Sequence, residues 1–195
     1  MANKVKWGLE NVYYAKATID PTNNTATYGT PVRWPGAVSL NMEPQGEQTP
    51  FRADNIDYWI GNANNGYEGD FESALIPDSF KKDILGMVED NKGVLIEVAD
   101  AEAEHFALLF QFEGDDNKTR HVLYNVTCGR PSISGETTGE TLEPQTETAS
   151  FRAISIHNAA LDTNLVKASV AESNATGSPY GTWFESVYQP AGLPS

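Results

Sequence analysis

The sequence predicts an all-β fold with one short helix, arranged as a two-sheet sandwich or small barrel. Three observations support this prediction. Apolar and polar residues alternate in many short segments, which is the period of a half-buried strand. Clusters of Gly, Pro, Asn and Asp separate most of these segments. One further segment has helical spacing and is bounded by residues that begin and end helices.

The first expected strand lies near the start of the sequence, where Val5, Trp7, Leu9 and Tyr13 share one parity. Near the other end, Val166–Val170 alternates in the same way. Between them, strands are expected at Val32–Leu40, Phe51–Ile60, Tyr67–Ile76, Val94–Val98 and Thr141–Ile156, with a last one at Trp183–Tyr188. A series of short strands separated by turns favours a sandwich or barrel.

The helix is expected at Ser79–Leu85, with Pro and Asp just before it and Gly86 just after it. Phe80, Ile84 and Met87 recur at a spacing that places them on one face. A helix of two to three turns is stable only when it packs on other elements. We therefore expect this face to lie against a sheet.

The segment Phe106–Phe112 is apolar on nearly both faces, which is typical of a central strand between two layers. Turn-forming residues follow at Gly114–Lys118, and Arg120–Cys128 is again rich in Val and Tyr. The three segments together predict a β-hairpin.

The chain of 195 residues is long enough for one well-buried domain. No convincing linker precedes Leu161, so residues 1–160 are expected to form one sandwich domain. Residues 161–195 are rich in Asn, Ser, Gly and Pro and are expected to add a strand and an arm to that domain.

An internal echo links two parts of the chain. Glu43–Glu47 and Phe51–Ala53 recur 100 residues later, in the same register, as Glu143–Glu147 and Phe151–Ala153. Two units are too few for a solenoid. We interpret the echo as two related strand pairs that either arose by duplication or converged on the same structural role.

The charge is strongly acidic: 13 basic and 27 acidic residues give a net charge of −14. This argues against a protein that grips nucleic acid or an anionic membrane electrostatically. The sequence contains no run of about 18 apolar residues, so no membrane span is expected. No apolar stretch follows the first lysines, so no signal peptide is expected.

No catalytic, metal or cofactor site is expected. Cys128 is the single cysteine and nothing near it in the sequence would activate it as a nucleophile. His105 lies close to acidic residues at positions 100, 102 and 104, which is more typical of a solvated connector than of a metal site. Gly114–Asp116 is explained by a hairpin turn.

The acidic residues are more informative than the histidines. Glu68, Asp70 and Glu72 share one parity on an expected strand, so their face must meet water. One interpretation is a solubilising surface. The other is the wall of a channel that must not bind a polyanion.

Several segments, in their order and spacing, resemble those of one known family. They are Val5–Ala15, Pro31–Leu40, Asp54–Tyr58, Asn62–Gly69, Ala74–Asp78, Phe80–Gly86, Phe106–Phe110, Thr119–Asn125, Arg130–Ser132 and Glu143–Glu147. In these segments the chain resembles the major tail proteins, or tail tube proteins, of long-tailed, non-contractile phages (siphophages) of Gram-positive bacteria. The resemblance covers about residues 4 to 152 and extends more loosely to Trp183 and Phe184.

The resemblance implies a structural virion protein, made in the bacterial host cytoplasm, that self-assembles into hexameric rings stacked as a tail tube. The implied partners are other copies of the chain, the tape measure protein, and the tail terminator and distal tail proteins. DNA would pass through the lumen only in transit. The family has no catalytic residues and no required cofactor.

Two sets of residues follow as expectations. Same-face acidic residues are expected to line the lumen: Glu43, Glu47, Glu68, Asp70, Glu72, Glu143 and Glu147. The extended loop Pro44–Gly66, with its aromatic residues, is expected to contact a neighbouring subunit. The expected contact residues are Phe51, Tyr58, Trp59, Asn64, Trp183 and Phe184.

Two alternatives remain open at this point. A carbohydrate-binding sandwich would use Trp34, Trp59 or Trp183 as a sugar platform. A hydrolase with two carboxylates, drawn from positions 43, 47, 68 and 72, would need a large cleft.

Overall fold

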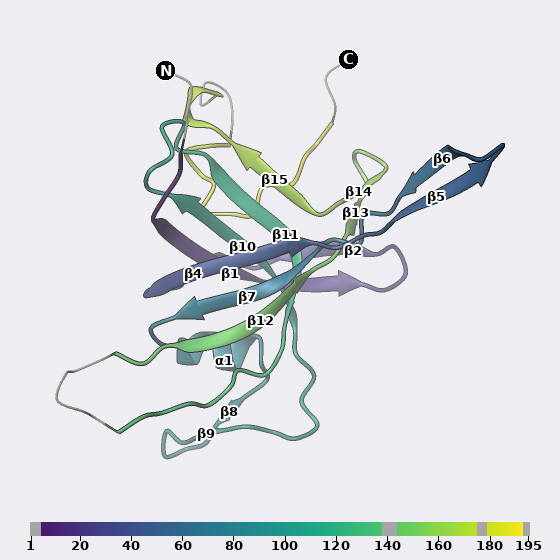
Figure 1. Ribbon diagram of the computed structural model, residues 1–195. Helices are drawn as coiled ribbons and strands as arrows, with labels where there is room; N and C mark the ends of the chain where they lie inside the picture. The colour runs from purple at the N-terminus through teal and green to yellow at the C-terminus, as the bar shows by residue number, and fades with distance from the viewer. Residues whose placement is uncertain (1–4, 138–143, 175–178, 193–195) are drawn as a thin grey trace.

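The computed structural model describes residues 5–137, 144–174 and 179–192 and is an all-β, sandwich-like fold with one short helix (Figure 1). In the described chain, one large antiparallel sheet follows the order β2-β1-β10-β11-β12-β7-β4, with β3 paired to β1 and β15 paired to β11. Its strands are β1 (Leu9–Asp20), β2 (Thr25–Tyr28), β3 (Val32–Arg33), β4 (Ala37–Pro44), β7 (Tyr67–Ser73), β10 (His105–Phe112), β11 (Arg120–Cys128), β12 (Glu147–Ala153) and β15 (Lys167–Val170).

Shorter elements extend from this sheet. Three two-stranded hairpins are β5 (Gln48–Ala53) with β6 (Ile56–Asn62), β8 (Val88–Glu89) with β9 (Leu95–Ile96), and β13 (Ile156–Asn158) with β14 (Thr163–Leu165). The helix α1 covers Asp78–Asp83, and a single 3₁₀ turn, η1, covers Glu172–Asn174. None of the helices among the described residues is long and apolar enough to cross a membrane.

Strand β11 joins the two layers of the sandwich. Its first half, Arg120–Leu123, pairs with β15, and its end, Val126–Cys128, pairs with β12. Between Leu123 and Val126 the register against β10 shifts by one residue. Such a β-bulge bends a strand and increases its twist. The bulge therefore lies where the sheet turns from the β1–β10–β11 layer into the β12–β7–β4 layer.

The first core lies between these layers and is rich in aromatic residues. Phe71 stacks on Phe151 with ring centroids 5.3 Å apart, and Trp34 packs edge-on against Phe71 at 4.9 Å. Phe80 of α1 and Ile84, directly after the helix, are fully buried in this core. Because each such side chain stabilises the fold by about 1.5–3 kcal/mol on burial, packing can hold a helix this short.

The helix confirms the sequence prediction within two residues. Gly86 follows it with φ +70°, a conformation that favours glycine. The first-strand prediction is wrong for Val5 and Trp7, which are exposed and precede β1. Asn11, with φ +49°, lies in a bulge of β1, so the alternation changes parity before the core is reached.

A second core covers the opposite face of the β1–β10–β11 layer. The prediction of a central strand is confirmed, because Phe106 and Leu108 belong to the first core and Ala107 and Leu109 to the second. Residues 180–188 cover this second core. Its members are Ala15, Ala107, Leu109, Val122, Tyr124, Ile156 and Trp183.

Not every strand prediction is correct. Val32–Leu40 is divided into β3 and the first half of β4 by a turn at Pro35 and Gly36, where Gly36 has φ +79°. Trp183–Tyr188 is not a strand: its first three residues lie in turns, with a 2.9 Å bond from the Glu185 N–H to the Thr182 carbonyl, and Val187 and Tyr188 have no regular structure. Phe51–Ile60 is not one strand but the second half of β5 and most of β6. Asp54 and Asn55, both with positive φ, make the tight turn between them.

Candidate functional site

One face of the β12–β7–β4 layer carries a group of acidic side chains. Glu68 on β7 lies between Glu43 on β4 and Arg152 on β12, and Asp70 and Glu72 follow along β7 on the same face. We call Glu43, Glu68, Asp70 and Glu72 the acidic face. Glu43 and Glu68 are directly opposite, an arrangement that is costly unless water or a cation screens it. Arg152 supplies one positive charge beside this pair.

Glu72 is held in place by two hydroxyl groups. Ser39 Oγ donates to Glu72 Oε2 at 3.1 Å, and Thr146 Oγ1 donates to Glu72 Oε1 at 2.6 Å. The carboxylate therefore keeps its charge at a defined position on the outer side of the layer.

Glu47 and Glu147, two of the other expected lumen residues, do not join the acidic face. Glu147 lies opposite the buried Ser73, and its Oε2 accepts the Ile76 N–H at 2.6 Å on the reverse side of the layer. Glu47 lies between β4 and β5, outside the large sheet. Glu143 lies outside the described residues. Shared parity within a segment therefore does not place Glu47 or Glu147 on the acidic face, because the face of a residue depends on the strand to which it belongs.

The hairpin β5–β6 projects from the body of the sandwich (Figure 1). We call it the hairpin arm. Phe51, Tyr58 and Trp59 are 60%, 70% and 61% exposed, and Ile56 and Ile60 are exposed as well. Side chains of this size gain stability when they leave water, yet nothing in the described chain covers them.

The base of the arm is firmly attached to the sandwich. Gln45 donates its N–H to the Gly66 carbonyl and accepts the Asn65 N–H, both at 2.8 Å, so the β4–β7 ladder continues into the arm. Asn64 is exposed, and its Oδ1 accepts the Gly66 N–H at 3.1 Å. A Cβ on Gly66 would lie 1.9 Å from the Ala153 carbonyl oxygen. This close approach anchors the arm against β12.

Trp183 and Phe184, expected to contact a neighbour, pack within their own chain. Trp183 is 1% exposed, and its Nε1 donates to the His121 carbonyl at 3.3 Å. Phe184 stacks on Tyr13 with ring centroids 4.9 Å apart. The buried Trp183 side chain has no surface left for a partner, which corrects the sequence expectation. Trp34 is buried too, so Trp59 is the one exposed ring among the three tryptophans considered as sugar platforms.

The polar residues first considered for chemistry have structural partners. Cys128 is buried, and burial raises the pKa of its thiol to about 12. His105 Nδ1 lies 2.6 Å from Asn125 Oδ1. Asp115 accepts the N–H groups of Asn117 and Thr119, as a turn residue does. Among the described residues, no group of three or more His, Cys, Asp or Glu side chains could hold a metal ion.

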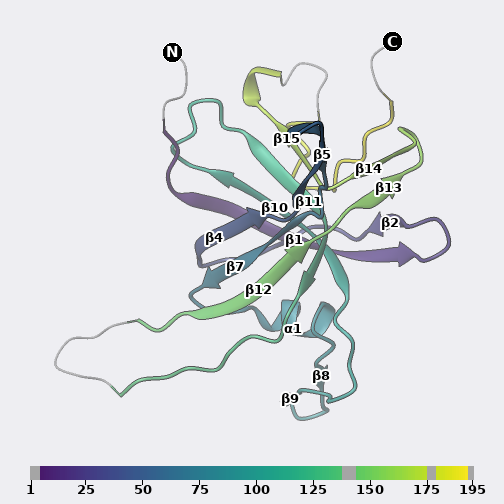
Figure 2. The same cartoon turned by 45° about the vertical axis from the view of Figure 1, so that its right-hand side comes forward.

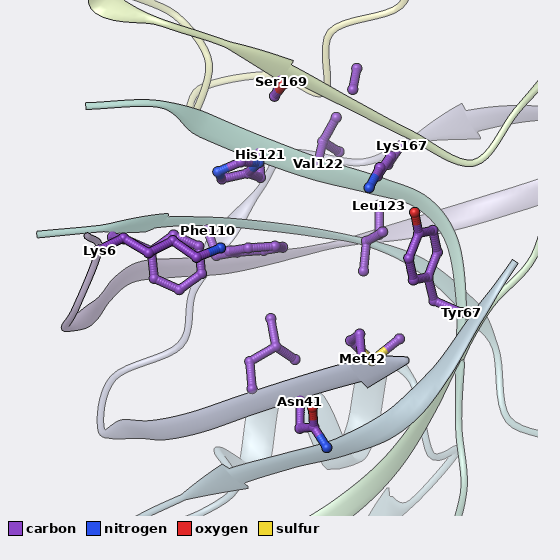
Figure 3. Close-up of a pocket in the computed structure, with 13 residues that line it drawn as sticks. Lys6, Asn41, Met42, Tyr67, Phe110, His121, Val122, Leu123, Lys167 and Ser169 are labelled. Carbon is purple, nitrogen blue, oxygen red and sulfur yellow. The ribbon is translucent and has the colours of Figure 1, made fainter. Parts of the chain in front are cut away.

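A cleft of about 370 Å³ lies between β4 on one side and β10, β11 and β15 on the other (Figure 3). None of its lining residues is Asp or Glu, so the four carboxylates considered for hydrolysis lie elsewhere. Sequence reasoning missed this cleft because its walls come from six separate segments of the chain. No local pattern brings them together.

Comparisons with models of known protein families and with curated proteins found no match to this chain. A functional assignment therefore depends on the arrangement of its own residues.

Proposed function

We propose that this protein is a structural subunit of a siphophage-type tail tube, assembling into hexameric rings that stack into a hollow rod. The observation that carries the proposal is the hairpin arm. It presents a row of exposed aromatic side chains, whereas both cores of the sandwich are already covered. Exposed aromatic residues on a rigid support are typical anchors of protein interfaces.

The open sheet adds support for self-assembly. In the described chain, its path ends at β2 and β4 (Figure 2). An exposed edge strand is an aggregation risk unless another strand or element covers it. A closed ring of identical subunits satisfies such edges without unlimited growth.

The acidic face is the proposed lining of the lumen. Glu43, Glu68, Asp70 and Glu72 offer a row of negative charge on the outer side of one layer. A wall of this sign repels phosphate, so DNA passes without sticking. The tape measure protein during assembly, and the tail terminator and distal tail proteins at the ends, are the further partners of this proposal, and the virion tail is its location.

Negative-stain microscopy of the purified protein tests the assembly. Hollow rods or rings of uniform width are expected. The double substitution Tyr58→Ser with Trp59→Ser should abolish them, because it removes the anchors of the arm. Val94→Ser with Ile96→Ser is the matched control, since these residues are also exposed but belong to the β8–β9 region. A wild-type protein that remains monomeric under all assembly conditions overturns the proposal.

A reconstruction of the rods tests the lumen. The acidic face should line the inner wall, and its position on the outer wall would contradict this part of the proposal. If acidic faces of neighbouring subunits meet, rods should also become less stable at low salt, where repulsion is less screened.

A carbohydrate-binding role is the second candidate, and the exposed Trp59 ring is the observation that favours it. A persistent monomer that binds glycans, and loses this binding on Trp59→Ala, would support the second candidate against the first.

A further inference from the structure

The cleft between the two layers is separate from the hairpin arm and from the acidic face. Figure 3 shows side chains of β4 on one side and of β10, β11 and β15 on the other, with Lys6 and Tyr67 near the two ends. Its volume of about 370 Å³ is within the range of small-molecule sites.

The middle of the cleft is lined by apolar side chains, whereas polar and charged residues lie around it. Met42 of β4 faces Phe110 of β10 and Leu123 of β11, and Leu40 of β4 lines the cleft as well. Leu40, Met42 and Phe110 are only partly buried, although all three pack against the first core. An apolar group that entered the cleft would cover this surface and gain the corresponding hydrophobic free energy.

Two lysines add positive charge to these walls. Lys6 Nζ lies 4.3 Å from the centroid of the Phe112 ring, and Lys167 Nζ lies 4.6 Å from that of Tyr67. In the part of the chain that the structure describes, neither ammonium group has a carboxylate within ion-pair distance, whereas Lys16 and Lys82 do. Both lysines are exposed, and together they give this cleft a positive charge in a chain of net charge −14.

His121 lies in the same cleft, and the charges of both lysines affect its pKa. Its ring stacks on Phe110 with centroids 5.2 Å apart. Burial, together with the charges of Lys6 and Lys167, keeps its pKa below the ordinary value, although Asp115 acts in the opposite direction. The imidazole is therefore neutral near pH 7, and the two ammonium groups supply the positive charge of the cleft.

We propose that this cleft binds a small amphipathic anion, a molecule with an apolar body and one carboxylate or sulfonate group. The body lies among Leu40, Met42 and Phe110, and the anionic group lies beside the Lys167 ammonium group at the Tyr67 end, while Lys6 adds positive charge at the other end. The charge complementarity selects anions over cations, and the apolar walls select an organic body over an inorganic ion. This inference does not depend on the proposed assembly.

The test is a fluorescence titration of the purified protein with 8-anilinonaphthalene-1-sulfonate, which has an aromatic body and one sulfonate. Lys167→Glu should weaken binding about tenfold, because it replaces an attraction to the sulfonate by a repulsion. The matched control is Lys92→Glu, the same charge change in the exposed turn between β8 and β9, which should leave binding unchanged.

Two further measurements separate the apolar part from the charged part. Met42→Trp should weaken binding of the sulfonate probe by filling the cleft. The uncharged analogue N-phenyl-1-naphthylamine should be sensitive to Met42→Trp but not to Lys167→Glu. Circular dichroism of each variant checks that the fold is retained, and Leu40→Phe replaces Met42→Trp if the latter does not fold.

Two results would overturn the proposal. One is equal weakening by Lys167→Glu and Lys92→Glu, which would show a general charge effect. The other is loss of probe binding on Tyr58→Ser with Trp59→Ser while Lys167→Glu has no effect. That result would place the probe on the hairpin arm.

Discussion

Strands β5 and β12 contain the same tripeptide, Phe-Arg-Ala, in opposite surroundings. Phe51 in β5 is 60% exposed and lies opposite Trp59 in a hairpin that projects into solvent. Phe151 in β12 is 1% exposed and touches Phe71 and Phe106 in the first core. The internal echo is therefore a repeat of strand-forming sequence, and the two copies do not have one structural job.

The difference comes from the strands on either side. β12 is hydrogen-bonded to β7 and β11 inside the large sheet, and one of its faces packs into the first core. β5 is paired with β6 alone in the described chain. In our proposal, a neighbouring subunit covers the Phe51 side chain, as the first core covers that of Phe151.

The largest change in stability is expected when the phenylalanine of each tripeptide is replaced by alanine. Phe151→Ala should lower the free energy of unfolding by about 3–5 kcal/mol, because it leaves a cavity in the aromatic core. Phe51→Ala should change it by less than about 0.5 kcal/mol in the monomer. Urea unfolding under non-assembling conditions measures both. Similar losses for the two variants would contradict the comparison.

The junction between the two regions is the next most sensitive point. Gly66→Ala should cost about 2–4 kcal/mol, because the residue has φ +90° and its new Cβ would meet the Ala153 carbonyl of β12. Gly181→Ala is the control, since no atom lies within 4 Å of a Cβ built there. Thermal unfolding of both variants would show whether the anchor of the arm matters to the sandwich.

The reaction rate of the Cys128 thiol gives a second way to compare the two phenylalanines. Cys128 lies beside Phe151 across the β11–β12 pair and is buried, with its pKa raised to about 12. Few thiolates exist at neutral pH, so the native protein should react slowly with a disulfide reagent. Phe151→Ala should speed this reaction by about tenfold, through easier opening of the core, and Phe51→Ala should not. An equally slow reaction in Phe151→Ala would indicate that the cavity closes.

The arginines of the two tripeptides give the smallest effect. Arg52 Nε lies 3.2 Å from Asp57 Oδ1 in an exposed pair, whereas Arg152 lies across from Glu68 in the acidic face. Both substitutions to Ala should cost no more than about 1 kcal/mol. The loss on Arg152→Ala should be the larger at low salt and should shrink in high salt, because Glu43 and Glu68 then repel each other less. A loss independent of salt would contradict this reading of the acidic face.

Local signals predicted a large part of the fold. The two-sided apolar pattern of Phe106–Phe112 indicated a central strand, and the structure places its alternate residues in two cores. The helix was predictable because its capping residues and apolar spacing lie within about ten residues of each other. The parity of Glu68, Asp70 and Glu72 likewise placed these three on one face.

The remaining features of the site depend on pairing between distant segments. Glu43 joins the acidic face only through the β4–β7 register, and Glu147 leaves it through the β7–β12 register. A bulge such as the one at Asn11 changes the parity of everything after it, and its position is set by the partner strand. Lys6 and Lys167 share a cleft although they lie near opposite ends of the chain.

The strand period, many of the turns and the helix could be predicted from residues that lie close together in the chain. The burial of other apolar residues could not be predicted in this way. Burial depends on what lies on the other side of a strand, and that neighbour comes from anywhere in the chain. Phe51 and Phe151, with the same two residues after each, are the clearest case: one is left in water and the other lies at the centre of the core.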